Sequence, residues 1–354
     1  MIRMLTGGES HNQGMLVIID GIPAGLMISV EFIQTELKRR KEGMGRSKRM
    51  KLEEEFVEIL SGVRLGRSIG SPMTLFIKNK DYRKDEFLSQ NGRKPITIPR
   101  PGHADLAGML KFGFFDIQDV LERASARETV SRVAAGAVFK LLLNEFNIKI
   151  NSRVIKIGKA KNRKEMEKLI VRAKKLGDTL GGIVEVYADG VCPGLGSYTQ
   201  FDKRLDGMIG MVMLSIPSVK GIEIGEAILS SMHYGSVVHD KIFYDKKCGF
   251  YRKTNNAGGI EGGMSNGERI LIRLYIKPIP TLQNPLESVD IKNKKLLPAP
   301  VFRADVCAVE AIGVIAESML AYVLAGAIVE KFGGDSIADM KRNYQAYLKR
   351  IKNV

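Results

Sequence analysis

The chain has 354 residues, 44% of them hydrophobic, so it is long and apolar enough to bury a core. Its formal net charge of +16 makes nucleic acid the first partner to consider. The sequence has no tryptophan and few aromatic residues among its arginines, which argues against a base-stacking surface. The longest nearly apolar run, residues 319–329, is too short to span a membrane. We therefore expect no nucleic-acid partner and no membrane association.

Cysteine usage and the N-terminal residues indicate a reducing compartment. Cys192, Cys248 and Cys307 are scattered and odd in number, which fits neither a disulfide framework nor a zinc site. Arg3 is soon followed by GGESHNQG and not by an apolar run, so the sequence shows no signal-peptide pattern. We expect a cytoplasmic protein.

The first part of the chain alternates apolar segments with glycine-rich turns. Residues 1–5 predict a strand, and GGESHN predicts a turn after it. A helix is expected from Ser29, with Gly43 stopping it. The basic segment at residues 43–50 predicts a loop, and MTLFIKN at residues 73–79 predicts a strand.

Two long predicted helices are apolar on most faces. VSRVAAGAVFKLLLNEF follows RASARET at Arg123, and DVCAVEAIGVIAESMLAYVLAGAIVEKFGG follows Arg303. A helix that is apolar nearly all round is buried, so both belong in the interior. Each begins after an Arg-Ala pair, Arg123-Ala124 and Arg303-Ala304, about half a chain apart. This spacing suggests internal two-fold symmetry, with coincidence as the open alternative.

The remaining segments predict strands, one long loop and a final helix. IKINSRVIKIG, GGIVEVYADG, GIEIGEAI and ERILIRLYIK are typical of strands. The glycines of NNAGGIEGGMSNGE predict an irregular loop. The last helix is amphipathic and begins at Ser336, where Asp339 completes a capping box.

Eight arginines stand in segments that we interpret as glycine-rich loops. Their fork-shaped guanidiniums suit the carboxylate or phosphate groups of a small molecule. They are Arg39, Arg40, Arg46, Arg49, Arg100, Arg123, Arg127 and Arg303. The sequence contains neither a P-loop nor a Rossmann fingerprint, so arginines and loop amides would have to hold any phosphate.

Two of the four histidines stand in segments with catalytic residue types. His103 lies in RPGHAD, residues 100–105, although a lone loop histidine is more often a surface or packing residue. Ser10 and His11 are adjacent in GGESHN. This segment lacks the Gly-x-Ser-x-Gly elbow of a serine hydrolase, and an ordinary turn is the alternative.

The other two histidines, His233 and His239, are expected at strand ends or on the surface. With Asp240 they form no recognisable metal-ligand spacing, so we expect no metal site. The loop histidines, the arginines and Asp305 together suit an anionic substrate whose phosphate leaves. An imidazolium would supply the proton, because a nearby anion favours the charged ring.

Eight segments resemble the chorismate synthase family, in the family's order and over nearly the whole chain. They are GESH, the RR…GR basic loop, RPGHAD, RASARET, VKGIEIG, NNAGGIEGGMSNGE, KPIPT and RADVC. The resemblance implies an α/β chain of the α+β type. In this β-α-β sandwich a central layer of buried helices lies between antiparallel sheets. It also implies a single domain over residues 1–354 and a homotetramer.

The resemblance further implies a lyase that makes chorismate from 5-enolpyruvylshikimate 3-phosphate. Phosphate leaves by anti-1,4 elimination with no net redox change, yet reduced FMN is required. The reduced flavin is thought to supply electron density that eases phosphate departure. NADPH would be used only if the protein reduced its own flavin, and the compact chain favours an outside reductant.

Four residues match the family's catalytic positions. His11 matches the histidine that protonates the leaving phosphate, and His103 matches the one that protonates or steadies reduced flavin near N1. Ser10 and Asp305 match a pair that relays a proton at N5. The implied flavin-binding positions are Arg123, Ala124, Ser125, Pro217, Ser218, Gly263, Lys277, Pro278, Ile279, Pro280, Thr281 and Arg303.

Substrate-anion binding is implied for Arg40, Arg46, Arg49, Arg127 and Arg303. The family's NADPH-associated arginines fall at Arg40 and Arg46, which makes these two cofactor-binding candidates as well.

Four residues depart from the family's usual motifs. Asn12 replaces the glycine of GESHG, and asparagine tolerates a positive φ. Ala124 removes one hydroxyl from RSSARET, worth roughly 1 kcal/mol of hydrogen bonding. Ala304 and Val306 replace residues of RHDP. These departures keep a catalytically silent flavin-binding relative open as an alternative, and the charge keeps a basic nucleic-acid-binding protein open.

Overall fold

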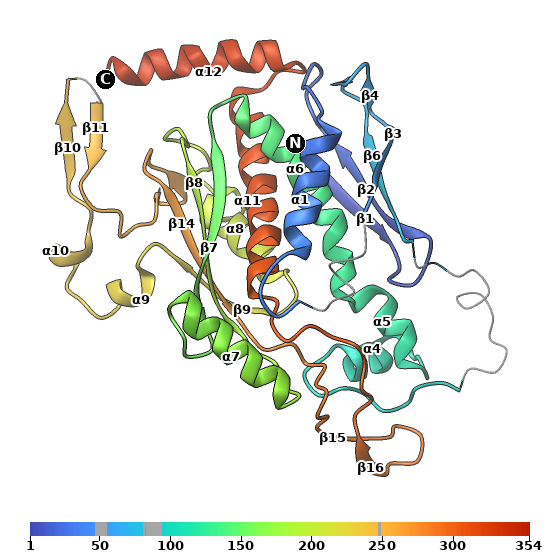
Figure 1. Cartoon of the computed structure of the whole chain (residues 1–354). Helices are drawn as coiled ribbons and strands as arrows, with labels where there is room; N and C mark the ends of the chain where they lie inside the picture. Colours follow the sequence, from blue (N-terminus) through green and yellow to red (C-terminus); the bar gives the residue numbers. More distant parts are fainter. Residues whose placement is uncertain (47–54, 81, 83–93, 247–248) are drawn as a thin grey trace.

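Two four-stranded antiparallel sheets enclose a layer of helices, which confirms the predicted β-α-β sandwich (Figure 1). The computed structural model describes residues 1–46, 55–80, 82, 94–246 and 249–354. Arg49 and Cys248 lie outside the described residues, as do residues 47–50 of the basic segment predicted at 43–50.

The first sheet has the strand order β1-β2-β6-β3. Its strands are Arg3–Gly8, Gly14–Asp20, Met73–Lys78 and Val57–Ser61, respectively. In β6 the side chains of Met73, Leu75 and Ile77 are buried and alternate with less buried neighbours. This period of two gives the sheet one apolar face, which packs on the helices.

The second sheet has the order β7-β8-β14-β9. Its strands are Lys149–Ile157, Gly182–Asp189, Ile270–Ile276 and Val219–Ile224, respectively. The segment GIEIGEAI was predicted to be strand throughout, and this was wrong beyond Ile224. Gly225 has a φ of +61°, and the short helix α9, Ala227–Ser230, follows it.

The two sheets are built to one plan, which supports the predicted internal two-fold symmetry. In each, the fourth strand along the chain lies between the second and third. A helix joins the second strand to the third: α1, Val30–Lys41, in the first half and α8, Leu205–Leu214, in the second. A long helix follows the fourth: α6, Thr129–Asn144, and α11, Val309–Phe332.

Helices α6 and α11 cross at the centre of the sandwich, and both are buried as predicted. Gly136 of α6 lies so close to Ser318 of α11 that a Cβ atom would overlap its side chain. By length and composition α11 could cross a membrane, so the expectation that no apolar run is long enough was wrong. However, 83% of its most apolar stretch is buried inside the protein.

The other helices and strands surround this framework. They are α4 Asp105–Phe112, α5 Ile117–Ala124, α7 Arg163–Lys175, α10 Gly235–Val238, α12 Ile337–Lys352, β4 Val63–Arg64, β5 Arg67–Ser68, β10 Ile242–Asp245, β11 Gly249–Arg252, β12 Ile260–Glu261, β13 Met264–Ser265, β15 Glu287–Val289, β16 Leu296–Pro298 and the 3-10 turns Ala126–Glu128 and Phe201–Lys203. The capping box of α12 is confirmed, because the Ser336 side chain accepts from Asp339 N.

One expectation about the second half was wrong in detail, because the NNAGGIEGGMSNGE loop contains a small hairpin, β12–β13. His233 and His239 are both exposed, which confirms that they are surface residues; they follow the one-turn helices α9 and α10. Within the described part of the chain, no three histidine, cysteine or acidic side chains gather in a group that could hold a metal ion.

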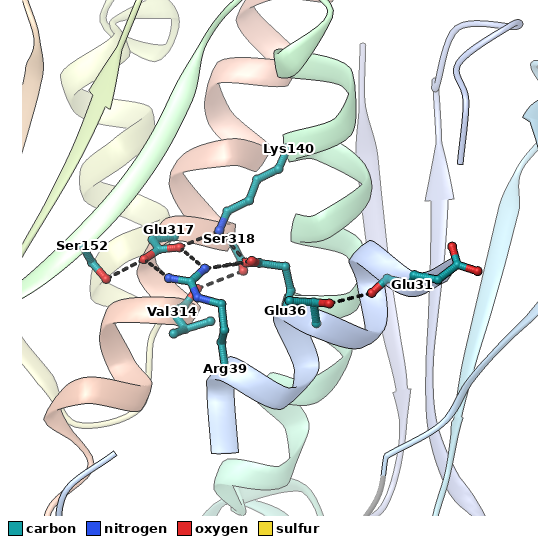
Figure 2. Close-up of polar contacts among 9 residues, drawn as sticks. Glu31, Glu36, Arg39, Lys140, Ser152, Val314, Glu317 and Ser318 are labelled. Atoms are coloured by element: carbon teal, nitrogen blue, oxygen red, sulfur yellow. Dashed lines mark hydrogen bonds and ion pairs between the residues drawn. The ribbon is translucent and has the colours of Figure 1, made fainter. Parts of the chain in front are cut away.

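A buried cluster of four charges ties the helical layer together (Figure 2). Glu317 of α11 accepts from Arg39 of α1 at 2.8 and 2.9 Å and from Lys140 of α6 at 2.5 Å. Lys140 also donates to Glu36 of α1, and Ser152 of β7 donates to Glu317. Arg39 was counted among the loop arginines available to an anion, and this was wrong, because it lies in α1, within the helix predicted from Ser29, and pairs with Glu36 and Glu317.

The charge cluster predicts a large loss of stability when Glu317 is replaced with glutamine. Removing one member leaves buried positive charge uncompensated, which costs about 3–5 kcal/mol. Urea unfolding at neutral pH measures the loss. Glu167→Gln is the control, because the Arg163–Glu167 pair is exposed and worth at most about 1 kcal/mol. Equal losses in the two variants would contradict the prediction.

The same cluster predicts how the difference in stability between wild type and Glu317→Gln changes with pH. Burial opposes ionisation of Glu317, but Lys140 and Arg39 outweigh it and lower the pKa of the carboxyl from its usual 4.5. A carboxyl whose pKa is lower in the folded state stabilises the protein at pH values above its unfolded pKa. This stabilisation is lost as the pH falls through the folded pKa. The stabilities of wild type and Glu317→Gln should therefore begin to converge as the pH falls below about 4.5 and should meet only below the lowered folded pKa. Urea titrations across this range test it.

Candidate active site

A cavity of about 1110 Å³ is lined by residues from both halves of the chain. Its walls come from the β1–β2 turn, the end of α1, residues 100–104 and the α5–α6 junction in the first half. The second half contributes residues 217–218, 277–281 and 302–305 and the first turns of α11. This volume slightly exceeds the usual range for one small ligand, roughly 300–1000 Å³, and leaves room for two.

Most of the predicted site residues meet at this cavity. Those that line it are Ser10, His11, Arg40, Arg46, His103, Ala124, Ser125, Arg127, Pro217, Ser218, Lys277, Ile279, Pro280, Thr281, Arg303 and Asp305. The lining does not include Arg123, Gly263 or Pro278. Arg123 points instead to β1, where it donates to the carbonyl oxygens of Thr6 and Gly8 at 3.1 and 3.0 Å.

His103 is held by a fully buried carboxylate, that of Asp105, at 2.5 Å from its Nδ1. The chain turns at Gly102, where φ is +78°, and this brings both ends of RPGHAD together. Arg100 donates to the two oxygens of Asp105 at 2.8 and 2.9 Å. Burial opposes ionisation, but the hydrogen bonds from His103 and Arg100 hold the pKa of Asp105 well below its usual range. Asp105 is therefore a permanent anion behind the imidazole.

Arg100 connects this group to the second half of the chain. It donates to Thr281 Oγ1 at 3.0 Å and lies 4.7 Å from the ring centre of Phe302. From the sequence, Arg100 was counted among the loop arginines, but neither it nor Asp105 was assigned a place in the site. The signal that could have identified both residues from the sequence was their position next to His103 in a Pro-Gly turn.

His11 is held from α5. The carboxylate of Glu122 lies 2.8 Å from Nδ1 of the ring and accepts from the backbone N–H of His11 at 2.9 Å. Ser10 Oγ donates to Ser125 Oγ at 3.1 Å. Glu122 was not recognised in the sequence, because nothing in its spacing marks a residue that is distant in the chain as the partner of His11.

Asn12 adopts no positive φ, so the expectation that it fills a glycine conformation was wrong. Its side chain donates to Glu9 at 2.7 Å and accepts from the N–H of Gln13 at 2.7 Å. The turn that follows β1 depends on Gly8 instead, where φ is +99° and a Cβ would collide with the Gly14 carbonyl. Asn12 thus replaces the family glycine without backbone strain.

The cavity wall near α1 carries two buried arginines. Arg40 donates to Glu55 at 2.5 Å and to Thr129 at 3.3 Å, but its buried Nε has no partner among the described residues. Arg46 donates to Asp305 at 2.6 Å, and burial lowers the pKa of its guanidinium while Asp305 opposes the effect. Cationic side chains outnumber carboxylates in the lining, so the cavity suits an anion.

Comparisons with known proteins place the whole chain in one family. The profile of the chorismate synthase family matches residues 2–329. Chorismate synthases from Caldanaerobacter subterraneus subsp. tengcongensis and Thermoanaerobacter pseudethanolicus are each 50% identical, and the alignments cover 99% of this chain and all of theirs. A crystal structure of chorismate synthase superimposes with a TM-score of 0.82 at 37% identity, covering 100% of this chain and 99% of that one.

The chain belongs to the chorismate synthase family. The predicted activity, that of a lyase which makes chorismate, is confirmed at the level of this family. The three differing segments around Asn12, Ala124 and Ala304 therefore lie within a sequence that matches the family over nearly its full length.

The Arg100–Asp105–His103 group predicts that Asp105→Asn is strongly destabilising. The variant leaves the buried guanidinium of Arg100 without its anion, and a broken buried pair costs about 3–5 kcal/mol. Thermal unfolding measures this. Asp206→Asn is the control, since its pair with Arg204 is partly exposed and should be worth about 1 kcal/mol or less. A small, equal effect of both substitutions would count against the arrangement described.

Proposed function

We propose that the cavity binds 5-enolpyruvylshikimate 3-phosphate beside reduced FMN and that the protein eliminates phosphate to give chorismate. One observation carries the proposal: His11, His103 and a group of guanidiniums line a single cavity of about 1110 Å³. A space of this size accommodates two ring-sized ligands, and its cationic wall suits two phosphorylated ones.

The residues present fit a flavin with its phosphate. Ser125, Lys277 and Thr281 offer two hydroxyls and an ammonium to the lining, and the buried Nε of Arg40 is a donor that lacks an acceptor within the described chain. Ser125 and Thr281 with Pro217 and Ser218 are the residues that would hold the cofactor. Bound reduced flavin would supply the electron density that eases phosphate departure.

The arginines hold the substrate's anionic groups. Arg40, Arg46, Arg127 and Arg303 line the cavity, and guanidiniums bind phosphate and carboxylate through paired hydrogen bonds. Fixing these groups sets the phosphate near the acid that protonates it. We assign this acid to His11, whose proton passes to the leaving phosphate oxygen.

His103 and the Ser10–Asp305 pair act on the flavin side. With Asp105 behind it, a protonated His103 places a positive charge at the cavity wall, where it would steady an anionic reduced flavin. Ser10 and Asp305 both line the cavity and would pass a proton at N5. Arg46, which also lines the cavity, pairs with the carboxylate of Asp305 at 2.6 Å.

The same proposal includes the protein's location, its oligomeric state and the source of its reductant. We assign it to the cytoplasm as a homotetramer that depends on an outside reductant and not on NADPH. The free, buried state of Cys192 and Cys307 supports a reducing compartment. Burial raises the pKa of each thiol to about 11, so neither is a reactive group.

An anaerobic assay with reduced FMN and the substrate tests the function. Wild-type protein should release phosphate and form chorismate, and His11→Ala should be slower by roughly 10²- to 10⁴-fold because its general acid is missing. His233→Ala is the matched control, since this exposed histidine lies outside the cavity lining and should retain wild-type turnover.

The same assay distinguishes the two alternatives. Flavin binding without turnover would indicate a catalytically silent relative. An absence of flavin binding, together with nucleic-acid binding that weakens steeply with salt, would indicate the basic nucleic-acid-binding protein. Either result would overturn the proposal.

A further inference from the structure

Glu122 contacts His11 without lining the cavity itself. We propose that Glu122 is a positioning residue that fixes the tautomer and direction of the His11 ring, so that Nε2 is the atom that delivers the proton. This inference rests on the proposed function of His11. It adds a residue to the site that the family resemblance did not supply.

The contacts of Glu122 restrict the position of the His11 ring and of its backbone. One carboxylate oxygen lies 2.8 Å from Nδ1 of the ring, and the other accepts from the backbone N–H of the same residue at 2.9 Å. Gln118, one helical turn earlier on α5, donates to the first oxygen at 2.7 Å and so holds the carboxylate in turn. Gln118 Nε2 also lies 3.4 Å from Nδ1, so the Glu122 carboxylate is the nearer partner of the ring and also holds its backbone.

The end of α5 also clamps the turn that carries His11. The carbonyl oxygen of Glu122 accepts from Ser10 N–H at 2.8 Å, and the side chain of Ser125 accepts from Ser10. Arg123 donates to Thr6 and Gly8 on β1. Together, residues 122–125 bind the turn through both backbone and side chains. This explains why Arg123 is directed away from the cavity.

The charge of Glu122 determines which ring nitrogen carries hydrogen. Burial opposes its ionisation, but the hydrogen bonds from the ring and backbone of His11 outweigh burial and lower the pKa of the carboxyl. A carboxylate only accepts, so Nδ1 must carry a proton toward it. The hydrogen bond at one imidazole nitrogen sets the state of the other.

The proton balance is then simple. The doubly protonated ring transfers its Nε2 proton to the leaving phosphate oxygen and becomes a neutral imidazole that still carries Nδ1–H. No proton needs to move to Glu122. The side chain of His11 is 59% exposed, so Nε2 can be reprotonated from solvent.

His103 has the same arrangement, but Glu122 is the better residue to test. Asp105 is fully buried and also holds Arg100, so its replacement disturbs the fold as well as the ring. Glu122 is held by Gln118 and pairs with His11. Its removal therefore changes the surroundings of the imidazole with less effect on the fold.

Nitrogen NMR of protein with ¹⁵N-labelled histidine tests the tautomer without flavin or substrate. The His11 signals are assigned by their loss in His11→Asn, and spectra are recorded near pH 9, above the ordinary imidazole pKa of roughly 6.5. Wild type should show protonated Nδ1 and bare Nε2. Glu122→Ala should lose this preference. Glu9→Gln is the matched control, because Glu9 lies in the same turn and pairs with Asn12.

Kinetics provide a second readout. Glu122→Ala should lower kcat for phosphate release by roughly 10- to 100-fold, the range found for carboxylates that orient metal-bound histidines, with KM changed much less. If circular dichroism shows that this variant is not folded, Glu122→Gln is measured in its place. Glutamine keeps the shape of the side chain and loses its charge, so we expect a weaker tautomer preference than in wild type.

Unchanged tautomers in Glu122→Ala and Glu122→Gln would overturn the inference, as would wild-type kcat in a folded Glu122 variant. A failure of the proposed function would look different. In that case wild-type protein would not release phosphate, while the NMR spectra would still show whether Glu122 sets the ring of His11.

Discussion

The buried pairing of Glu317 with Arg39 and Lys140 is the interaction on which the rest of the structure depends (Figure 2). It joins α1 and α6 of the first half to α11 of the second. Apolar packing, including the close approach of Gly136 to Ser318, also holds these helices together, but hydrophobic burial by itself has little direction. Charges that must meet inside the protein allow few positions. We regard the cluster as the element that fixes the register of the helical layer.

The cavity takes its shape from that register. Arg40, which directly follows Arg39 on α1, lines the cavity and donates to Thr129 at the start of α6. Ala311 and Ile312 bring the first turns of α11 to the same wall. A helix displaced by one residue would exchange Arg40 for a neighbour that points elsewhere, since successive side chains are about 100° apart. The charge cluster and the cationic wall of the cavity are therefore parts of one arrangement.

The sequence predicted helices and strands better than it predicted which charged side chains pair. The central helices were predicted because a helix that is apolar on all faces must be buried, and the strands because of their β-branched runs. The residues of the cavity followed from motifs. The partners of charged side chains were not predicted. Arg39 was counted among the loop arginines but pairs with Glu317, and Glu122 was not considered as a partner of His11. Such pairs join segments far apart in the chain, and local spacing carries no record of them.

The two halves share one plan, and the cavity is lined by residues of both. His11 and His103 come from the first half, whereas Lys277, Arg303 and Asp305 come from the second. Neither half alone contains both the imidazoles and the residues opposite them. The central helices of both halves are apolar on most faces, and polar contacts between the halves add direction to their docking. Arg100 on Thr281, Arg46 on Asp305 and the charge cluster supply such contacts. The first two join the halves at the cavity wall, whereas the charge cluster joins them within the helical layer.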